Sequence, residues 1–448
     1  MAPRIVSAIL FSPRGGSAHV ARALANGLRT LGWHVELVAG SRGDLGTHGD
    51  ASAFYGEVHP VRFDAALASD DPPRFDGPPG TAPMHPSFED RPGAPDWVFA
   101  SLDDLAYERQ VHAWARELRR AGAGEADVIH LHHLTPINEA VARIAADVPV
   151  VGQLHGTELL MLEQIVAGPP AGWRHAERWA ERLQRWAANC ERIVVAPGGV
   201  DRAISLLELP RERVVPLPNG VDLELFHPRQ IDRRSFWRRV LLDAPQGESY
   251  REEAVEQLAA GVVFMYVGRF TAVKRLELLI AAFHRARAKF PSPGGLVLVG
   301  GHPGETEGEH PAEIVRRLGV SDVFLAGWHS QQRLPEFFSA ADAVVLASER
   351  EQFGSVLVEG MACGLPVIAT RSIGPATIVD DGETGWLVSP HDEAALADAL
   401  VEVVADPAER ERRGSLALDA ARQRFSWTGV AAQFAEVLEQ VLGSTRVA

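Results

Sequence analysis

Residues 343–367 read AVVLASEREQFGSVLVEGMACGLPV, a stretch that combines a buried strand, a short glycine-containing turn and a helix. Glu351 follows the strand at 343–347, and Glu359 lies within the helix. Between the two acids is a turn whose backbone N–H groups would point outward at the start of the helix, made of Phe353, Gly354, Ser355 and Val356. Such a helix N-terminus binds anionic oxygens, including those of phosphate, and carboxylates accept hydrogen bonds from vicinal hydroxyls. Phosphate and hydroxyl groups side by side predict a site for a nucleotide-sugar.

Apolar runs with strand character alternate with helical patterns over the rest of the chain. We expect strands at 4–11, 34–39, 127–132, 149–154, 262–267, 295–299 and 323–325, and helices at 18–31, 138–146 and 276–289. This alternation implies an α/β fold with parallel sheets, which bind ligands at the carboxyl ends of their strands. A length of 448 residues suits two domains of roughly 200 residues each. We place the first domain at 1–205 and the second at 206–424.

The composition is that of an ordinary globular enzyme, with 46% hydrophobic and 23% charged residues. The two cysteines, Cys190 and Cys363, lie in apolar helical patterns and are expected to be buried free thiols in a reducing cytoplasm. No apolar run approaches the ~20 residues of a membrane span, and the start RIVSAILFSP is expected to be a buried strand rather than a leader. A net charge of −15 argues against a nucleic-acid partner.

A few local cations and glycines are placed to hold a diphosphate. Arg269 and Lys274 follow the strand at 262–267, and an Arg fork and a Lys point charge suit phosphate oxygens in complementary ways. Gly15 and Gly16 lie between the first strand and the first helix, where glycine allows close approach of a ligand. The loop lacks the full G-x-G-x-x-G fingerprint, so it does not indicate dinucleotide binding.

These motifs resemble those of the bacterial, nucleotide-sugar-dependent retaining glycosyltransferases of family 4. The resemblance covers nearly the whole chain in the family's order, through the Gly15–Gly16 loop, PNGVD at 218–222, VGRFTAVKR at 267–275, the stretch quoted above, DDGETGWLV at 380–388 and FSW at 425–427. It implies the GT-B architecture, in which two Rossmann-like doubly wound domains face a central cleft. It also implies that residues 425–448 form a helix that returns to the first domain.

The resemblance assigns a role to each candidate residue. Arg269 and Lys274 would stabilise the diphosphate leaving group, and the Gly15–Gly16 loop would close over it. Glu351 would bind hydroxyls of the sugar and Glu359 the ribose diol. His155, at the end of the strand at 149–154, matches a family position that contacts the donor sugar.

The chemistry implied is transfer of a hexose-type sugar from a nucleoside-diphosphate sugar to an unidentified small-molecule or glycan acceptor, with retention by front-face attack. The resemblance also implies that no metal and no cofactor take part. The chain departs from the family pattern at Gln352 and at Gly360, which would weaken its helix slightly.

Two other functions remain open from the sequence. A nucleotide-sugar epimerase would act on the donor alone, and a non-catalytic nucleotide-sugar-binding protein would keep the diphosphate-binding residues Arg269 and Lys274 without turnover.

Several further segments carry a choice between structure and function. HLHH at 130–133 has no carboxylate or Cys to complete a zinc set, so we expect it to line the acceptor side; His130 and His132 share a strand face and His133 does not.

The Pro- and Gly-rich residues 70–96 form either a plain surface loop or an acceptor-recognition loop. Aromatic residues beside arginines could touch a membrane surface, but we expect core packing for Trp179, Leu183, Trp186, Phe236 and Trp237.

Overall fold

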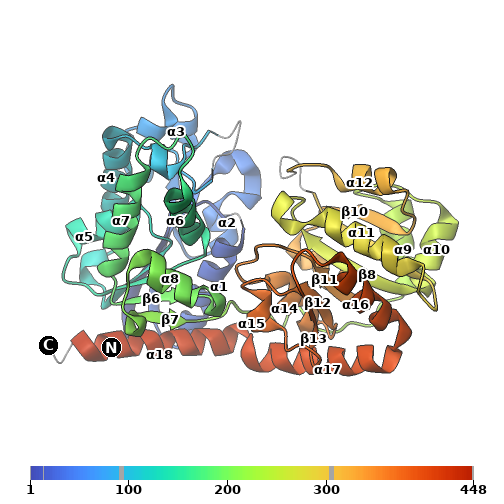
Figure 1. Cartoon of the computed structure of the whole chain (residues 1–448). Helices are drawn as coiled ribbons and strands as arrows, with labels where there is room; N and C mark the ends of the chain where they lie inside the picture. The colour runs from blue at the N-terminus through green and yellow to red at the C-terminus, as the bar shows by residue number, and fades with distance from the viewer. Residues whose placement is uncertain (1, 14, 90–94, 302–306, 446–448) are drawn as a thin grey trace. The chain divides into compact units, whose positions relative to one another are not determined.

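The computed structural model describes residues 2–13, 15–89, 95–301 and 307–445, and the chain forms two compact units (Figure 1). The first unit consists of Met1–Pro218 and Val430–Ala448, and the second of Asn219–Gly429. The boundary expected at 205–206 falls inside helix α8 (Val200–Leu207). The first unit continues beyond it because strand β7 (Val214–Pro216) still pairs with strand β6 (Arg192–Val195).

The first unit is built on a parallel seven-stranded sheet in the order β3-β2-β1-β4-β5-β6-β7. Besides β6 and β7, its strands are β1 (Arg4–Ile9), β2 (His34–Ser41), β3 (His59–Arg62), β4 (Val128–His132) and β5 (Val150–Gln153). The strand order reverses direction between β1 and β4, the point at which doubly wound sheets bind ligands.

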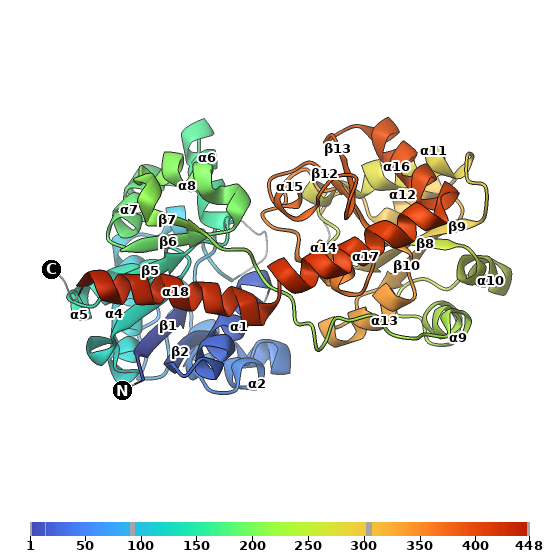
Figure 2. The ribbon, with the colours of Figure 1, turned by 90° about the horizontal axis from the view of Figure 1, so that it is seen from below.

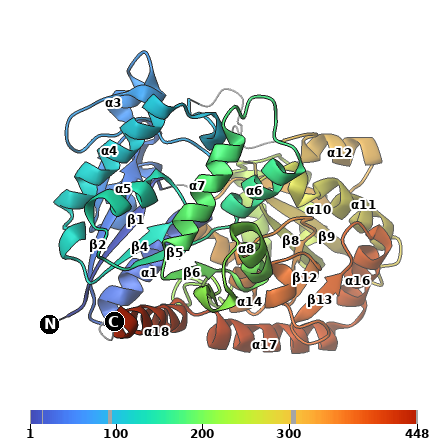
Figure 3. The same ribbon diagram turned by 60° about the vertical axis from the view of Figure 1, so that its left-hand side comes forward.

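Helices connect the strands of the first sheet, as the parallel pairing requires. They are α1 (Gly16–Thr30), α2 (Ala51–Tyr55), α3 (Asp64–Leu67), α4 (Asp104–Arg120), α5 (Pro136–Ile144), α6 (Thr157–Ala167), α7 (Ala176–Ala188) and α8. Helices α4 and α5 lie side by side (Figure 3). The last helix, α18 (Trp427–Thr445), packs on this unit (Figure 2). Ala431 lies against Gly27 of α1, and the Phe434 ring is 4.6 Å from the His130 ring.

The second unit repeats the same plan with a parallel six-stranded sheet in the order β10-β9-β8-β11-β12-β13. Its strands are β8 (Val262–Gly268), β9 (Gly294–Gly300), β10 (Val323–Gly327), β11 (Ala343–Leu346), β12 (Val367–Thr370) and β13 (Gly385–Val388). Its helices are α9 (Arg233–Arg238), α10 (Glu252–Ala260), α11 (Leu276–Arg287), α12 (Pro311–Leu318), α13 (Leu334–Ser339), α14 (Ser355–Ala362), α15 (Pro375–Ile378), α16 (Glu393–Ala405) and α17 (Pro407–Arg424). The switch point of this sheet lies between β8 and β11.

Gly360 has a packing reason that helix propensity alone does not reveal. It faces β11 from α14, and a Cβ at this position would lie 2.4 Å from Cγ2 of the buried Val344. The weak helix former therefore allows the helix to approach the sheet.

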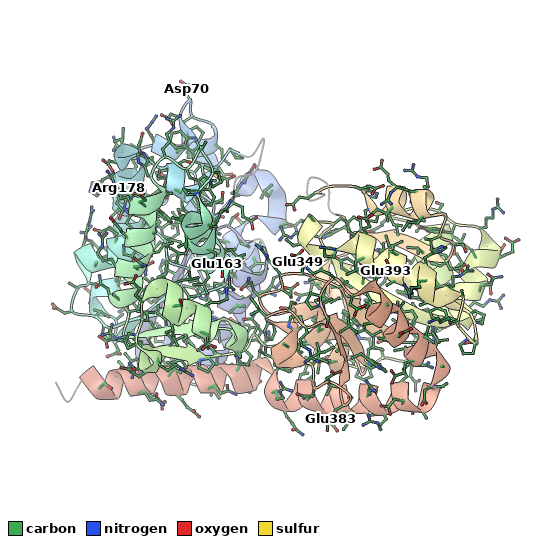
Figure 4. All side chains as sticks on the ribbon, viewed as in Figure 1. Asp70, Glu163, Arg178, Glu349, Glu383 and Glu393 are labelled. Atoms are coloured by element: carbon green, nitrogen blue, oxygen red, sulfur yellow. The ribbon has the colours of Figure 1, made fainter. Side chains whose placement is uncertain are left out.

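The aromatic residues beside arginines pack inward, which confirms the core interpretation. Trp179, Leu183, Trp186, Phe236 and Trp237 are at most 2% exposed. The arginines around them are paired: Arg178, labelled in Figure 4, lies 2.6 Å from Asp104, and Arg233 lies 2.8 Å from Asp342.

Both cysteines are free and buried, as expected. Among the described residues, no helix is long and apolar enough to cross a membrane.

The Pro- and Gly-rich segment is anchored to α4 rather than loose. Arg116 donates hydrogen bonds to the carbonyls of Gly77, Pro78 and Thr81 at 2.7–3.0 Å. The buried Gln110 side chain donates to the carbonyl of Met84 at 2.7 Å. Residues 90–94 of the segment lie outside the described part of the chain. The described part is held in place because Arg116 and Gln110 of α4 donate hydrogen bonds to its backbone carbonyls.

Candidate active site

The loops after β8 and β11 meet at the switch point of the second sheet through an ion pair. Lys274 Nζ donates to Glu351 Oε2, and both side chains are largely buried, at 17% and 16% exposed. An ammonium group has three N–H donors, so Lys274 keeps donors beyond the one that Glu351 accepts. The structure therefore brings together a cation and an acid that the sequence places 77 residues apart.

A second ion pair and two backbone contacts hold these loops in place. Arg275 Nη1 lies 3.1 Å from Oε2 of Glu349, which is labelled in Figure 4, and the Glu349 N–H donates to the carbonyl of Val273 at 2.9 Å. The fully buried Tyr266 donates its hydroxyl to the carbonyl of Arg269 at 2.7 Å. Burial, and secondarily the charge of Glu351, raises the pKa of Tyr266 above its ordinary value, so the hydroxyl stays a donor.

Arg269 itself is exposed at the carboxyl end of β8. Its guanidinium forms no ion pair with any residue of the described ranges. The anchored backbone thus carries a guanidinium fork with several N–H donors and no carboxylate partner in the described ranges.

Helix α14 begins at Ser355, as the turn in the sequence predicts. Gly354 precedes it with φ 101°, a left-handed conformation that favours glycine, and provides no side-chain cap. Phe353 is buried with its ring 6.0 Å from that of Phe425, and this packing holds the turn in place. The first N–H groups of a helix have no partner within the helix, so the chemistry of this end, beside Glu351, suits an anion.

Glu359 lies one turn along the same helix face as Ser355, four residues on. Its side chain is half-buried, and Gln331 Nε2 donates to its Oε1 at 3.1 Å. Burial raises the pKa of Glu359 to about 7, although the Gln331 hydrogen bond acts in the opposite direction. The hydrogen bond from Gln331 therefore orients the Glu359 side chain, while poor solvation makes its negatively charged form less stable than in water.

The Gly15–Gly16 loop follows β1 in the first unit. Gly15 has φ 80°, and a Cβ at either glycine would meet no heavy atom of the described residues within 4 Å. Both residues are exposed, so the backbone at the start of α1 is open to a ligand.

His155 follows β5 and belongs to a cluster of histidines at the carboxyl ends of β4 and β5. Its Nε2 lies 3.1 Å from His132 Nδ1. The rings of His130 and His132 are 4.3 Å apart, which confirms that they share a strand face, whereas His133 lies beyond the strand with φ 66°. Burial is the main cause that lowers the pKa of His132 and His155 well below 6.5, and neighbouring histidines add to it. Both rings are therefore neutral near pH 7.

Three residues at these sites escaped the sequence analysis. Tyr266 donates to a carbonyl three residues further along the chain, and Gln331 contacts Glu359 on a separate helix; no motif in the sequence records either contact. Glu158, fully buried, accepts a hydrogen bond from the His155 N–H at 3.3 Å and contacts His133. Its place three residues after His155 was the one available signal. Among the described residues, no group of three or more His, Cys, Asp or Glu side chains is placed to hold a metal ion.

Comparison with known families accounts for both halves of the chain. Residues 14–225 match the family described as Glycosyltransferase Family 4, and residues 252–418 match that described as Glycosyl transferases group 1. The D-inositol 3-phosphate glycosyltransferase of Kribbella flavida is 32% identical over 336 residues, covering 71% of this chain and 73% of the relative. The enzyme of that name from Mycolicibacterium smegmatis is 30% identical over 345 residues, covering 73% and 71%.

Solved structures share the fold over almost the full length. Sucrose-phosphate synthase from Thermosynechococcus elongatus has a TM-score of 0.69 at 22% identity, covering 99% of this chain and 100% of that one. Anabaena HepE, solved in complex with UDP and glucose, has a TM-score of 0.67 at 19% identity, covering 97% and 99%. The family matches and the fold together lead to one conclusion: the chain belongs to the family 4 glycosyltransferases and has their GT-B architecture of two Rossmann-like units.

Proposed function

We propose that this glycosyltransferase moves a hexose-type sugar from a nucleoside-diphosphate sugar to an acceptor with retention at the anomeric carbon, without a metal or cofactor. The observation that carries the proposal is the largely buried Lys274–Glu351 pair beside the open N-terminus of α14. One end of this arrangement suits diphosphate oxygens and the other suits sugar hydroxyls. Anabaena HepE, which has the same fold, was solved with UDP-glucose, and this supports a donor of that class.

Each residue has a role in this proposal. Arg269 and Lys274 neutralise the diphosphate, while Glu351 accepts hydrogen bonds from the sugar. Glu359 accepts hydrogen bonds from the ribose diol. His155 contacts the donor sugar. Backbone N–H groups of the turn hold phosphate oxygens, and the turn consists of Phe353, Gly354, Ser355 and Val356; Gly15 and Gly16 approach the diphosphate in the same way.

The proposed reaction is a front-face substitution. The bond between the anomeric carbon and the diphosphate oxygen breaks, and the acceptor oxygen bonds to that carbon from the same face. The departing diphosphate takes the acceptor proton, so no protein base is required. Stabilising the charge on the leaving group is then the main catalytic contribution, and fixed donors in a partly desolvated site do this effectively.

The test begins with a thermal-shift screen against UDP, GDP, ADP and their common sugar conjugates, with EDTA present throughout. A ligand that binds only the folded protein raises the melting temperature. We expect one nucleotide and its sugar conjugate to do so. If no nucleotide or sugar conjugate raised the melting temperature, the proposed donor site would be contradicted.

The positive donor is then incubated with D-inositol 3-phosphate, the compound for which the curated relatives are named, and with other polyols. Proton NMR of the new glycosidic linkage is expected to show the anomeric configuration of the donor. Inversion would contradict the retaining mechanism. Conversion of the donor without any acceptor would favour an epimerase, and binding without turnover on a broad acceptor panel would favour a non-catalytic protein.

A further inference from the structure

The histidine cluster of the first unit contains a hydrogen bond whose direction decides what His155 can do. Nδ1 of His132 and Nε2 of His155 are 3.1 Å apart, so one nitrogen carries the proton and the other accepts it. Two neutral arrangements satisfy this contact. In one, His132 donates and His155 keeps its own proton on Nδ1; in the other, His155 donates from Nε2 and its Nδ1 carries a lone pair.

The far side of His132 distinguishes the two arrangements. Its Nε2 is buried and has no hydrogen-bond partner among the described residues, and the whole residue is 1% exposed. If His155 donated, this Nε2 would carry a buried N–H without an acceptor, and a buried N–H is left unpaired less often than an acceptor lone pair is. If His132 donates from Nδ1, only a lone pair is left unpaired. The geometry therefore favours donation by His132.

Glu158 fixes the backbone of His155 from the other side. Its carboxylate is fully buried. Oε2 accepts a hydrogen bond from the backbone N–H of His155 at 3.3 Å, and Oε1 lies 2.6 Å from the ring nitrogen Nδ1 of His133. A carboxylate only accepts, so the His133 nitrogen donates. Glu158 also lies in the first turn of α6, where the helix dipole favours a negative charge.

His133 is itself held rigidly. Its ring lies 5.0 Å from that of Phe11 and 5.6 Å from that of Phe88, and its backbone N–H donates a hydrogen bond to the Gln153 carbonyl at 2.9 Å. Phe88 belongs to the Pro- and Gly-rich segment, which therefore forms part of the wall behind the cluster. The titratable groups that face His155 are thus His132 and His133 at the end of β4, with His130 behind them, and Glu158 on α6.

We propose that His132 and Glu158 are positioning residues that hold His155 as the neutral tautomer protonated on Nδ1. In this form His155 donates a hydrogen bond to a sugar oxygen and does not act as a general base. The proposal rests on the donor-contact role of His155 in the function proposed above. It agrees with a reaction in which the leaving diphosphate, and not the protein, takes the acceptor proton.

The first test reads the tautomer directly and needs no substrate. Long-range proton–nitrogen correlation spectra of protein labelled with ¹⁵N in its histidine rings distinguish the two tautomers, and the His155→Asn variant assigns the signal. We expect His155 to be protonated on Nδ1 and to be neutral at pH 7, because burial lowers its pKa well below 6.5. Protonation on Nε2, or a doubly protonated ring at pH 7, would overturn the proposal whatever the enzyme's activity.

The second test measures kcat and KM with the nucleotide-sugar found in the thermal-shift screen. His132→Leu removes the donor, whereas His132→Asn keeps an N–H near the Nδ1 position. His132→Leu and Glu158→Gln should lower kcat at least about tenfold with the donor KM within about threefold, while His132→Asn stays close to the wild type. A matched control is Glu117→Gln, since Glu117 is also a buried carboxylate that accepts a backbone N–H, from Gly80 at 2.9 Å.

A purely structural role would lower the melting temperature of the Glu158 and Glu117 variants similarly and leave kcat unchanged in both. That result, or a His132→Asn variant as slow as His132→Leu, would contradict the proposal. If the wild-type protein turned over no nucleotide-sugar, the proposed function would fail, and the spectra would still decide the tautomer.

Discussion

Replacing Glu359 by glutamine should stabilise the protein in a way that depends on pH. The half-buried carboxyl has a pKa of about 7 in place of its ordinary 4.5. Between these pH values the folded protein binds a proton that the unfolded chain has lost. The free energy of unfolding of the wild type therefore falls as pH rises from 4.5 through 7, and it levels off above about pH 8. A glutamine amide in this place would not titrate, and its oxygen could still accept the hydrogen bond from Gln331.

The size of the effect follows from the pKa values. The difference between a pKa of about 7 in the folded protein and 4.5 in the unfolded chain corresponds to about 3 kcal/mol, at 1.36 kcal/mol for each pKa unit. Because Glu359 is half-buried and keeps some contact with water, we expect about half of this, or ~1.5 kcal/mol, above pH 8. For a unit of this size each kcal/mol shifts the melting temperature by about 2–4 °C, so the variant should melt roughly 3–6 °C higher.

The assay is a series of thermal melts from pH 4.5 to 8.5 on the wild type, Glu359→Gln and the control Glu383→Gln. Glu383 is an exposed carboxylate of the same unit, labelled in Figure 4, so its replacement removes the same charge without changing a buried group. The difference between Glu359→Gln and the wild type should be small at pH 4.5 and grow through pH 7. A constant difference, or one that the Glu383 variant shares, would refute the reasoning.

The stabilised variant should lose function, since an amide is a weaker acceptor for ribose hydroxyls than a carboxylate. We expect it to bind the preferred nucleoside diphosphate at least about tenfold more weakly at pH 8, which isothermal titration would measure. Stability gained and affinity lost in one substitution would identify Glu359 as a ligand-binding group. Unchanged affinity would exclude it from the ribose site.

Three further substitutions test other parts of the structure. Lys274→Ala should lower turnover at least about a hundredfold without loss of folding. Lys289→Ala, which removes an exposed lysine paired with Asp398, should leave turnover unchanged. Equal activity of the two variants would exclude Lys274 from stabilising the leaving group. Gly360→Ala should lower the melting temperature by about 2–6 °C although alanine is the better helix former, because the new Cβ would overpack β11; a higher melting temperature would show that helix propensity decides. Gly15→Ala should reduce kcat/KM at least about tenfold, whereas Gly32→Ala, with φ 88° and equally open space, imposes the same backbone strain and should leave kcat/KM unchanged; similar kinetics in both would indicate that the first loop does not approach the substrate.

The sequence alone predicted the architecture well, because apolar runs of the right length and spacing determine parallel sheets. The strands at 262–267 and 295–299 correspond to β8 and β9, and the first helix at 18–31 to α1. The boundary between the units differed because β7 is only three residues long and ends in a proline, a weak strand signal. Family 4 membership was also predicted, since the motifs occur in order over nearly the whole chain.

The contacts that tune the candidate site were not predicted. Nothing in the sequence near Gln331 points to Glu359, and the direction of the hydrogen bond between His132 and His155 depends on what surrounds the far side of His132. The packing reason for Gly360 likewise depends on Val344, a residue of the neighbouring strand. These features arise when separate elements meet, and local patterns carry no record of such meetings.

Hydrogen exchange followed by mass spectrometry tests the central claim most directly, that the second unit binds a diphosphate between the loop after β8 and the start of α14. The protein is measured alone and with a saturating amount of whichever of UDP, GDP or ADP raises its melting temperature. Our account predicts slower exchange in the peptides that cover 268–276 and 353–360. Protection confined to other parts of the second unit, or no protection at all, would contradict it.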